Sequence, residues 1–141
     1  MRPSLRTLAW FIGALGAAIL QPAITSARAD EAETVKKVFA SQLPNAPGNS
    51  LTAFVVNYAP GGNSPTHHHT GSVFAYVLSG AIRSQVSTDG PVKIYKAGES
   101  FFESPGSTHL VSENASETEP ASLLAVFVAE DNAKLTMPGA Q

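Results

Sequence analysis

The chain has 141 residues, a length typical of a single domain, and it contains no cysteine. The lack of cysteine excludes disulfides, thiolate metal ligands and a thiol nucleophile. Its 9 Lys and Arg residues are outnumbered by 11 Asp and Glu residues, whereas proteins that bind a nucleic-acid backbone rely on clustered basic side chains. Composition therefore predicts a protein that does not bind nucleic acid and that depends on a packed core for its stability.

The first stretch of the chain has the layout of a bacterial signal peptide. Two arginines precede an apolar run, Leu8–Leu20, and a small-residue cleavage signal ends at Ala29. The apolar run is shorter than the about 20 residues that a membrane span needs. We therefore expect residues 1–29 to be cleaved off and residues 30–141 to form one mature domain, periplasmic or secreted and free of the membrane. A retained membrane anchor is the alternative.

The mature part of the chain is expected to be all-β, with no helix. Short apolar runs rich in Val, Phe, Tyr and Leu are separated by Gly, Pro, Asn and Ser, which is typical of strands and turns in a sandwich or barrel. Residues 31–43 fit an edge strand or a short helical turn, residues 44–49 a loop, and residues 132–141 a loosely held tail. The other predicted strands are Leu51–Tyr58, Val73–Ser79, Ala81–Ser87, Val92–Tyr95, Ser100–Glu103, His109–Ser112 and Ser122–Ala129.

All four histidines of the chain lie in two places. His67, His68 and His69 are consecutive, and on an extended chain the outer two point to one side while His68 points to the other. His109 follows a Pro-Gly turn that leads into another predicted strand. A single exposed histidine is ordinarily solvated, but an i, i+2 pair with a distant histidine after such a turn is typical of strand-built metal sites. His67, His69 and His109 are therefore candidate ligands of one divalent metal ion, with Fe, Mn, Zn, Ni or Cu as the candidates.

Two segments of the sequence resemble the motifs of the cupin superfamily, in the form of small single-domain bacterial cupins. The first motif has a Gly, then His-x-His, and later a closing Gly; these places are held by Gly61, His67, His69 and Gly80. The second has a Gly, then Pro-x-Gly and a His; these places are held by Gly98, Gly106 and His109, with the proline displaced by one to Pro105. The resemblance implies the cupin double-stranded β-helix, a jelly-roll barrel.

One position departs from the cupin pattern. The Glu that usually completes the family's metal site, seven residues before the closing Gly, is replaced by Val73. Glu103, six residues before His109 at the end of a predicted strand, is a candidate replacement ligand. Alternatively, Glu103 is solvated or accepts hydrogen bonds from turn amides. The expected site is therefore three histidines with one carboxylate, or three histidines alone, in both cases with positions open to water or substrate.

The resemblance implies two kinds of function. Cupins include dioxygenases, decarboxylases, isomerases and lyases, so the first expectation is a metalloenzyme that acts on a small molecule, although the fold does not select the reaction. The alternative is a non-catalytic cupin that binds a small ligand or the metal itself, which the missing motif Glu favours. Small cupins commonly pair through an edge of the barrel, so a homodimer is also expected.

Overall fold

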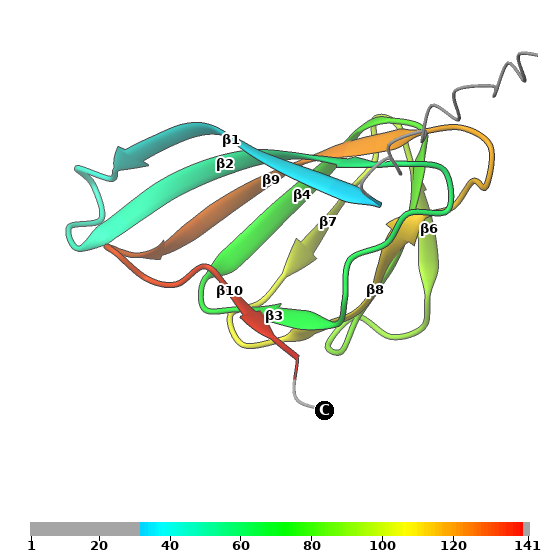
Figure 1. Ribbon diagram of the computed structural model, residues 1–141. Coiled ribbons are helices and arrows are strands. Elements are labelled where there is room, and N and C mark those ends of the chain that lie inside the picture. Colours follow the sequence, from blue (N-terminus) through cyan, green and yellow to red (C-terminus); the bar gives the residue numbers. More distant parts are fainter. Residues whose placement is uncertain (1–31, 140–141) are drawn as a thin grey trace, which may run out of the picture.

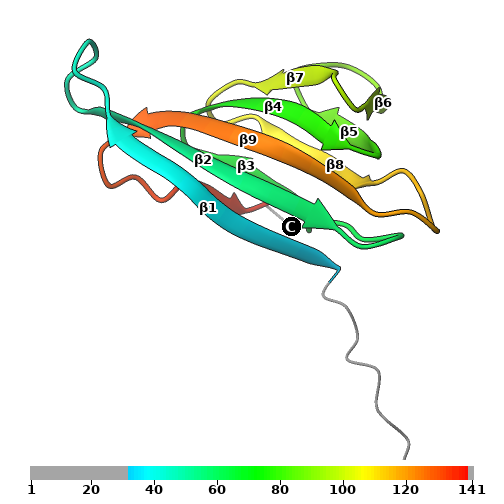
Figure 2. The same cartoon turned by 90° about the horizontal axis from the view of Figure 1, so that it is seen from above.

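The computed structural model describes residues 32–139, which form two five-stranded antiparallel sheets packed face to face (Figure 1). The first sheet has the order β1-β2-β9-β4-β7, built from Glu33–Gln42, Asn49–Tyr58, Ala121–Glu130, Ser72–Ser79 and Ser100–Glu103. The second sheet has the order β10-β3-β8-β5-β6, built from Thr136–Pro138, His67–His69, Thr108–Asn114, Ala81–Val86 and Lys93–Lys96. Figure 2 shows the two layers from above. The all-β jelly-roll prediction is confirmed.

The strands predicted from alternating apolar residues are all present, with ends that differ by at most two residues. The ambiguous segment 31–43 contains the edge strand β1, and no helix occurs among residues 32–139. None of the described segments could therefore cross a membrane as a helix. The predicted signal peptide and its cleavage site lie outside the described residues.

The prediction of a loosely held tail is wrong. Residues 136–138 form β10, which pairs with β3 in antiparallel register, so that Thr136 lies opposite His69. β3 has only three residues, and β8 pairs with it on its other side. The tail therefore supplies the second partner of a strand that is too short to be stable with one neighbour.

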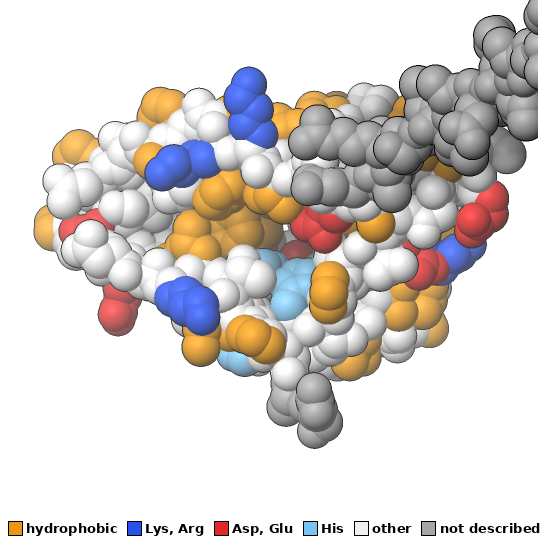
Figure 3. All heavy atoms as spheres, viewed as in Figure 1, with side chains coloured by type: hydrophobic (Ala, Val, Ile, Leu, Met, Phe, Trp, Pro, Cys, Tyr) orange, Lys and Arg blue, Asp and Glu red, His pale blue; other side chains and the backbone are white. Residues whose placement is uncertain are grey.

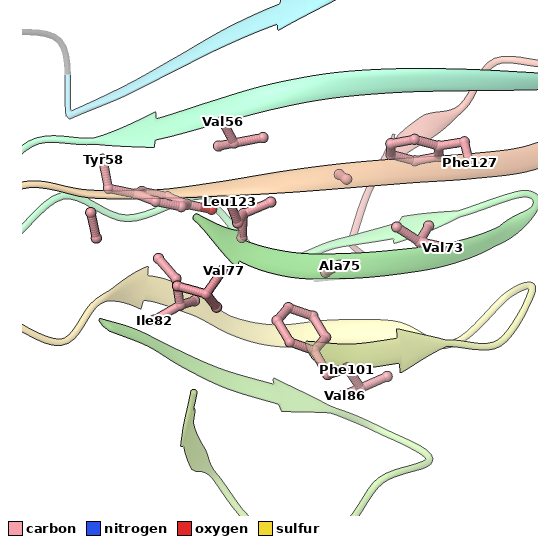
Figure 4. Close-up of a cluster of buried hydrophobic side chains, with 12 residues drawn as sticks. Val56, Tyr58, Val73, Ala75, Val77, Ile82, Val86, Phe101, Leu123 and Phe127 are labelled. Atoms are coloured by element: carbon pink, nitrogen blue, oxygen red, sulfur yellow. The ribbon is translucent and has the colours of Figure 1, made fainter. Parts of the chain in front are cut away.

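Alternation along the inner strands β4, β5 and β9 produces the core between the sheets. Along β9 every second side chain is buried: Ala121, Leu123, Ala125, Phe127 and Ala129. The largest fully buried side chains are Val73 and Val77 of β4 and Ile82 of β5. Figure 4 shows these side chains pointing into the space between the two sheets.

The two sheets meet along one side of the sandwich and separate along the other. On the closed side, the rings of Tyr95 in β6 and Phe101 in β7 lie with centroids 4.9 Å apart, which joins one edge strand of each sheet. On the opposite side the edge strands are β1 and β10. Residues of both line a pocket between the layers, so the sandwich is accessible from this side.

Candidate metal centre

The three predicted histidine ligands converge between the two sheets. His67 and His69 lie on β3, and the register with β8 places His67 directly opposite His109. One ligand atom from each of the three imidazoles lies within 4.8 Å of the others. We refer to His67, His69 and His109 as the histidine cluster. His68 is opposite Thr108 and lies outside this cluster, as its position on the other side of the strand requires.

Backbone carbonyls orient the two histidines of β3. Nδ1 of His67 lies 2.7 Å from the carbonyl oxygen of Pro65, and Nδ1 of His69 lies 3.0 Å from that of Leu135. Because a carbonyl oxygen only accepts hydrogen bonds, each Nδ1 carries the proton and each Nε2 keeps its lone pair. Burial lowers the pKa of His69, although the negative charge of Glu103 raises it in part. His69 is therefore neutral near pH 7, the form in which imidazole binds metal ions.

Ser84, a residue that the motifs do not predict, orients His109. The Ser84 hydroxyl lies 2.8 Å from Nε2 of His109, and both side chains are buried. Nδ1 of His109 is therefore the nitrogen that faces Glu103, at 3.3 Å from Oε1. The signal in the sequence is its spacing: Ser84 lies at the second position after Ile82 and before Val86, so it shares the inward face of the strand with these two apolar residues.

Glu103 adds a carboxylate to the histidine cluster. It is only 3% exposed, and its Oε2 lies 3.7 Å from Nε2 of His69. Burial by itself raises the pKa of Glu103, but the hydrogen bond with His109 and the charges of the histidines lower it by more, so the net shift is downward. The alternative of a solvated Glu103 is therefore wrong, and none of the described turn amides donates to it.

One oxygen of Glu103 is left without a partner. Oε2 is buried and makes no hydrogen bond with the described residues. An ionised carboxylate oxygen in this condition is costly unless a cation or a donor compensates for it. Three imidazoles and one carboxylate suit Fe, Mn, Zn, Ni or Cu. The residues present therefore fit a divalent transition metal ion.

The register of β4 and β7 places Glu103 next to Val73, the residue at which the resemblance to the cupin motif implied a Glu. Val73 pairs directly with Glu103. Paired residues of antiparallel strands lie on the same face of the sheet, with Cβ atoms about 4.5–5.5 Å apart. The carboxylate is thus moved to the neighbouring strand but still points at the histidine cluster, and the buried Val73 packs beside it.

A pocket of about 720 Å³ lies beside the histidine cluster, between the two sheets. This volume is within the range of small-molecule binding sites. Figure 3 shows histidine side chains, in pale blue, beside a hollow with orange hydrophobic walls. The apolar walls include Phe54, Val56, Phe101, Leu123 and Phe127. The pocket thus combines the polar side chains of the histidine cluster with apolar walls.

The sequence of this chain matches the family model of the cupin domain over residues 54–127, more than half of its 141 residues. This chain belongs to the cupin family. The matched segment contains the histidine cluster and Glu103. Among curated proteins, none matches this cupin.

Solved structures share the fold at low sequence identity. A protein with a double-stranded β-helix domain from Klebsiella pneumoniae subsp. pneumoniae MGH 78578 has a TM-score of 0.62 at 23% identity, over 79% of this chain and 88% of its own. Oxalate decarboxylase from Lactobacillus farciminis has a TM-score of 0.61 at 20% identity, over 77% of this chain and 31% of its own. DMSP lyase DddQ from Ruegeria pomeroyi DSS-3 has a TM-score of 0.54 at 20% identity, over 62% of this chain and 42% of its own. This cupin therefore spans less than half of either enzyme, and the likeness shows the fold alone.

Proposed function

We propose that this cupin binds one divalent metal ion through the histidine cluster and Glu103, and that it uses the ion to transform a small molecule held in the adjacent pocket. The observation that carries the proposal is Oε2 of Glu103, an ionised oxygen buried without a partner beside three imidazoles. A bound metal would supply Lewis-acid or redox chemistry. Solved cupins of this fold include a lyase and a decarboxylase, so these reaction classes should be tested first.

The residues of the chain itself would prepare this site in three ways. The Pro65 and Leu135 carbonyls hold Nε2 of the two β3 histidines free, and Ser84 holds the ring of His109. The apolar walls make the surroundings of a bound ligand less polar than water, which strengthens its electrostatic interactions. The histidine cluster and Glu103 lie on strands of both sheets, while the Pro65 and Leu135 carbonyls come from the segments that lead into β3 and β10.

A non-catalytic binding function is the second candidate. Among the described residues that line the pocket, the only carboxylates are Glu103 and Glu33. If Glu103 is occupied by the metal, Glu33 on the edge strand β1 is the one carboxylate left to move a proton. This shortage of proton acceptors favours capture of a ligand without chemistry.

The test begins with elemental analysis of the purified protein. We expect about one transition-metal ion per chain, lost in His67→Ala and retained in the matched control His68→Ala, because only His67 belongs to the cluster. Product formation is then measured with small organic acids, diketones and catechols, together with oxygen consumption. No metal in the wild-type protein would overturn the proposal, and metal without turnover would favour the binding function.

We also propose that two copies associate through the outer face of the first sheet. On this face Phe74, Tyr76 and Leu78 of β4 and Phe102 of β7 are each between 38% and 54% exposed, and β4 and β7 place no charged side chain there. Such an apolar patch is typical of an interaction site. A second copy fits it, because a self-complementary contact between two uncharged apolar faces needs no opposite charge on the partner. The resemblance to other cupins implied pairing through an edge of the barrel, whereas this surface is a sheet face.

We further propose that the protein acts outside the cytoplasm, as a periplasmic or secreted protein. The support is the N-terminal pattern of two arginines, an apolar run and a cleavage signal at Ala29.

A further inference from the structure

We propose that the hydroxyl groups of Tyr58, Ser64 and Ser112 form a second binding subsite in the pocket, and that this subsite takes an uncharged, hydrogen-bonding group of the substrate whose other end binds the metal. We call these three residues the hydroxyl triad. The inference rests on the proposed function and deepens it, because it names the class of molecule that the pocket accepts.

The hydroxyl triad is assembled from three separate segments of the chain. The Tyr58 hydroxyl lies 2.8 Å from Oγ of Ser64 and 2.8 Å from Oγ of Ser112. Tyr58 ends β2, Ser112 lies on β8, and Ser64 lies in the connection between β2 and β3. Tyr58 and Ser112 are only 3% and 5% exposed, yet all three residues line the pocket that also contains the histidine cluster. A ligand held at the cluster therefore shares its cavity with the triad.

The hydrogen-bonding capacity of the triad is not used up within the protein. Three hydroxyls carry three protons, and the two contacts between them use two. These hydroxyls have no further hydrogen-bond partner among the described residues. One proton and several lone pairs are therefore available to a molecule in the pocket. A carbonyl, hydroxyl or ether group of a ligand would complete the network, and a methyl group would leave it incomplete.

Charge around the triad argues against a second carboxylate on the substrate. Burial raises the pKa of Tyr58, the hydrogen bonds with its serine partners lower it, and the negative charges of Glu33 and Glu103 raise it again. Both glutamates line the same pocket. Lys134, which is exposed, is the only Lys or Arg among the described lining residues. A carboxylate at the triad would thus be buried near the negative charge of Glu33, in a pocket whose only described Lys or Arg lining residue is the exposed Lys134.

The walls of the pocket define the middle part of the ligand. Apolar side chains, among them Val56 and Leu123, line the cavity that contains both polar groups. The substrate class is therefore a molecule with a metal-binding head, an apolar middle and a neutral polar tail. Small dicarboxylic acids do not meet this description, because their second carboxylate carries a negative charge where the neutral polar tail should be.

Straight-chain hydroxamates of increasing length test this inference, because the hydroxamate group binds metal ions as a bidentate monoanion. Each length is measured with a methyl, a hydroxyl or a carboxylate end, by titration calorimetry on the metal-loaded protein. At one chain length, we expect the hydroxyl-ended compound to bind about 3-fold to 10-fold more tightly than the methyl-ended one. The carboxylate-ended compound should bind more weakly than both.

Variants of the triad separate recognition from folding. In Tyr58→Phe and Ser112→Ala, the advantage of the hydroxyl end should disappear, while metal content and binding of the methyl-ended compound stay unchanged. Ser64→Ala gives the same test at a less buried position if Tyr58→Phe fails to fold. The inference is overturned if the hydroxyl end gives no advantage at any length, if the advantage survives in these variants, or if the carboxylate end binds best. Failure of the proposed function is distinguishable, because the wild-type protein would then hold no metal and bind no hydroxamate, and the inference would fall with it.

Discussion

At the position where cupins usually carry a metal-binding Glu, this chain has a buried Val73, and the carboxylate comes from Glu103 on the neighbouring strand. The exchange keeps one carboxylate on the same face of the sheet, next to the histidine cluster. In the metal-free protein, Oε2 of Glu103 is buried and has no hydrogen-bond partner among the described residues. The residue is therefore expected to matter more to metal binding than to folding.

Replacing Glu103 with Gln should weaken metal binding by at least the about 10-fold to 100-fold seen for losses next to a metal site. The thermal stability of the metal-free protein should change little, because the amide of Gln has nearly the same shape and its oxygen can still accept a hydrogen bond from His109. Competitive chelation and thermal unfolding measure the two quantities. Glu130→Gln, at an exposed strand end, is the matched control. Unchanged metal affinity in Glu103→Gln would leave a site of three histidines alone.

At the scale of elements, the candidate site depends on the shortest strands of the protein. β3 carries two histidines of the cluster in three residues and is held between β8 and β10. The segment that leads into β10 also provides the Leu135 carbonyl that accepts a hydrogen bond from His69. The C-terminal segment therefore orients a candidate metal ligand, in addition to lining the pocket.

A chain that ends at Asn132 should lose β10 and the acceptor for His69. We expect its metal affinity to fall by about 10-fold or more, and its unfolding temperature to fall because β3 is left with one neighbour. A chain that ends at Gly139 keeps both and is the control. The measurements are competitive chelation and thermal unfolding. If the shorter chain binds metal as tightly as the control, the carbonyl of Leu135 does not position His69.

At the scale of the whole molecule, the first sheet has a buried inner face and an exposed outer face. The inner face packs against the second sheet and lines the pocket, while the outer face of β4 and β7 is apolar and uncharged. An uncharged apolar face of this kind favours burial against a second copy. The proposed dimer would cover this face and leave open the side between β1 and β10.

Phe102→Glu places a charge in the middle of the proposed interface and should shift the protein from dimer to monomer in sedimentation velocity experiments. Ile94→Glu is a matched control, because Ile94 is 52% exposed and Phe102 is 54% exposed, but Ile94 lies on β6 of the other sheet. The control should sediment as the wild type does. A wild-type protein that is monomeric at all concentrations would contradict the proposal.

Export is tested on the full-length chain in a secreting bacterial host. Cleavage after Ala29 predicts a mature N-terminus at Asp30, which mass spectrometry of the extracellular or periplasmic fraction would detect. The apolar run Leu8–Leu20 is the part of the signal that the export machinery would recognise. An intact Met1 in a membrane fraction would instead show that this run is an anchor.

The strands and the candidate histidine ligands could be predicted because each depends on residues close together in the chain. Alternation with a period of two marks a half-buried strand wherever it folds. The same rule separates His67 and His69 from His68 before any tertiary contact is considered. The second motif, with its Pro-Gly turn before His109, is equally local. These features therefore needed no knowledge of how the strands pair.

The remaining parts of the site depend on which strands are neighbours and in which register. The pairing of Val73 with Glu103, the contact of Ser84 with His109, and the contact of Tyr58 with Ser112 each join segments that are distant in sequence. A shift of one residue in any of these pairings would turn the side chains to the other face. The sequence by itself thus determined an all-β chain in which His67 and His69 point to the same side of one strand and His109 belongs to a second motif. Only the tertiary structure decided that Glu103 joins them, that the tail completes β3 and that hydroxyls line the same pocket, because these contacts exist only once the sheets have formed.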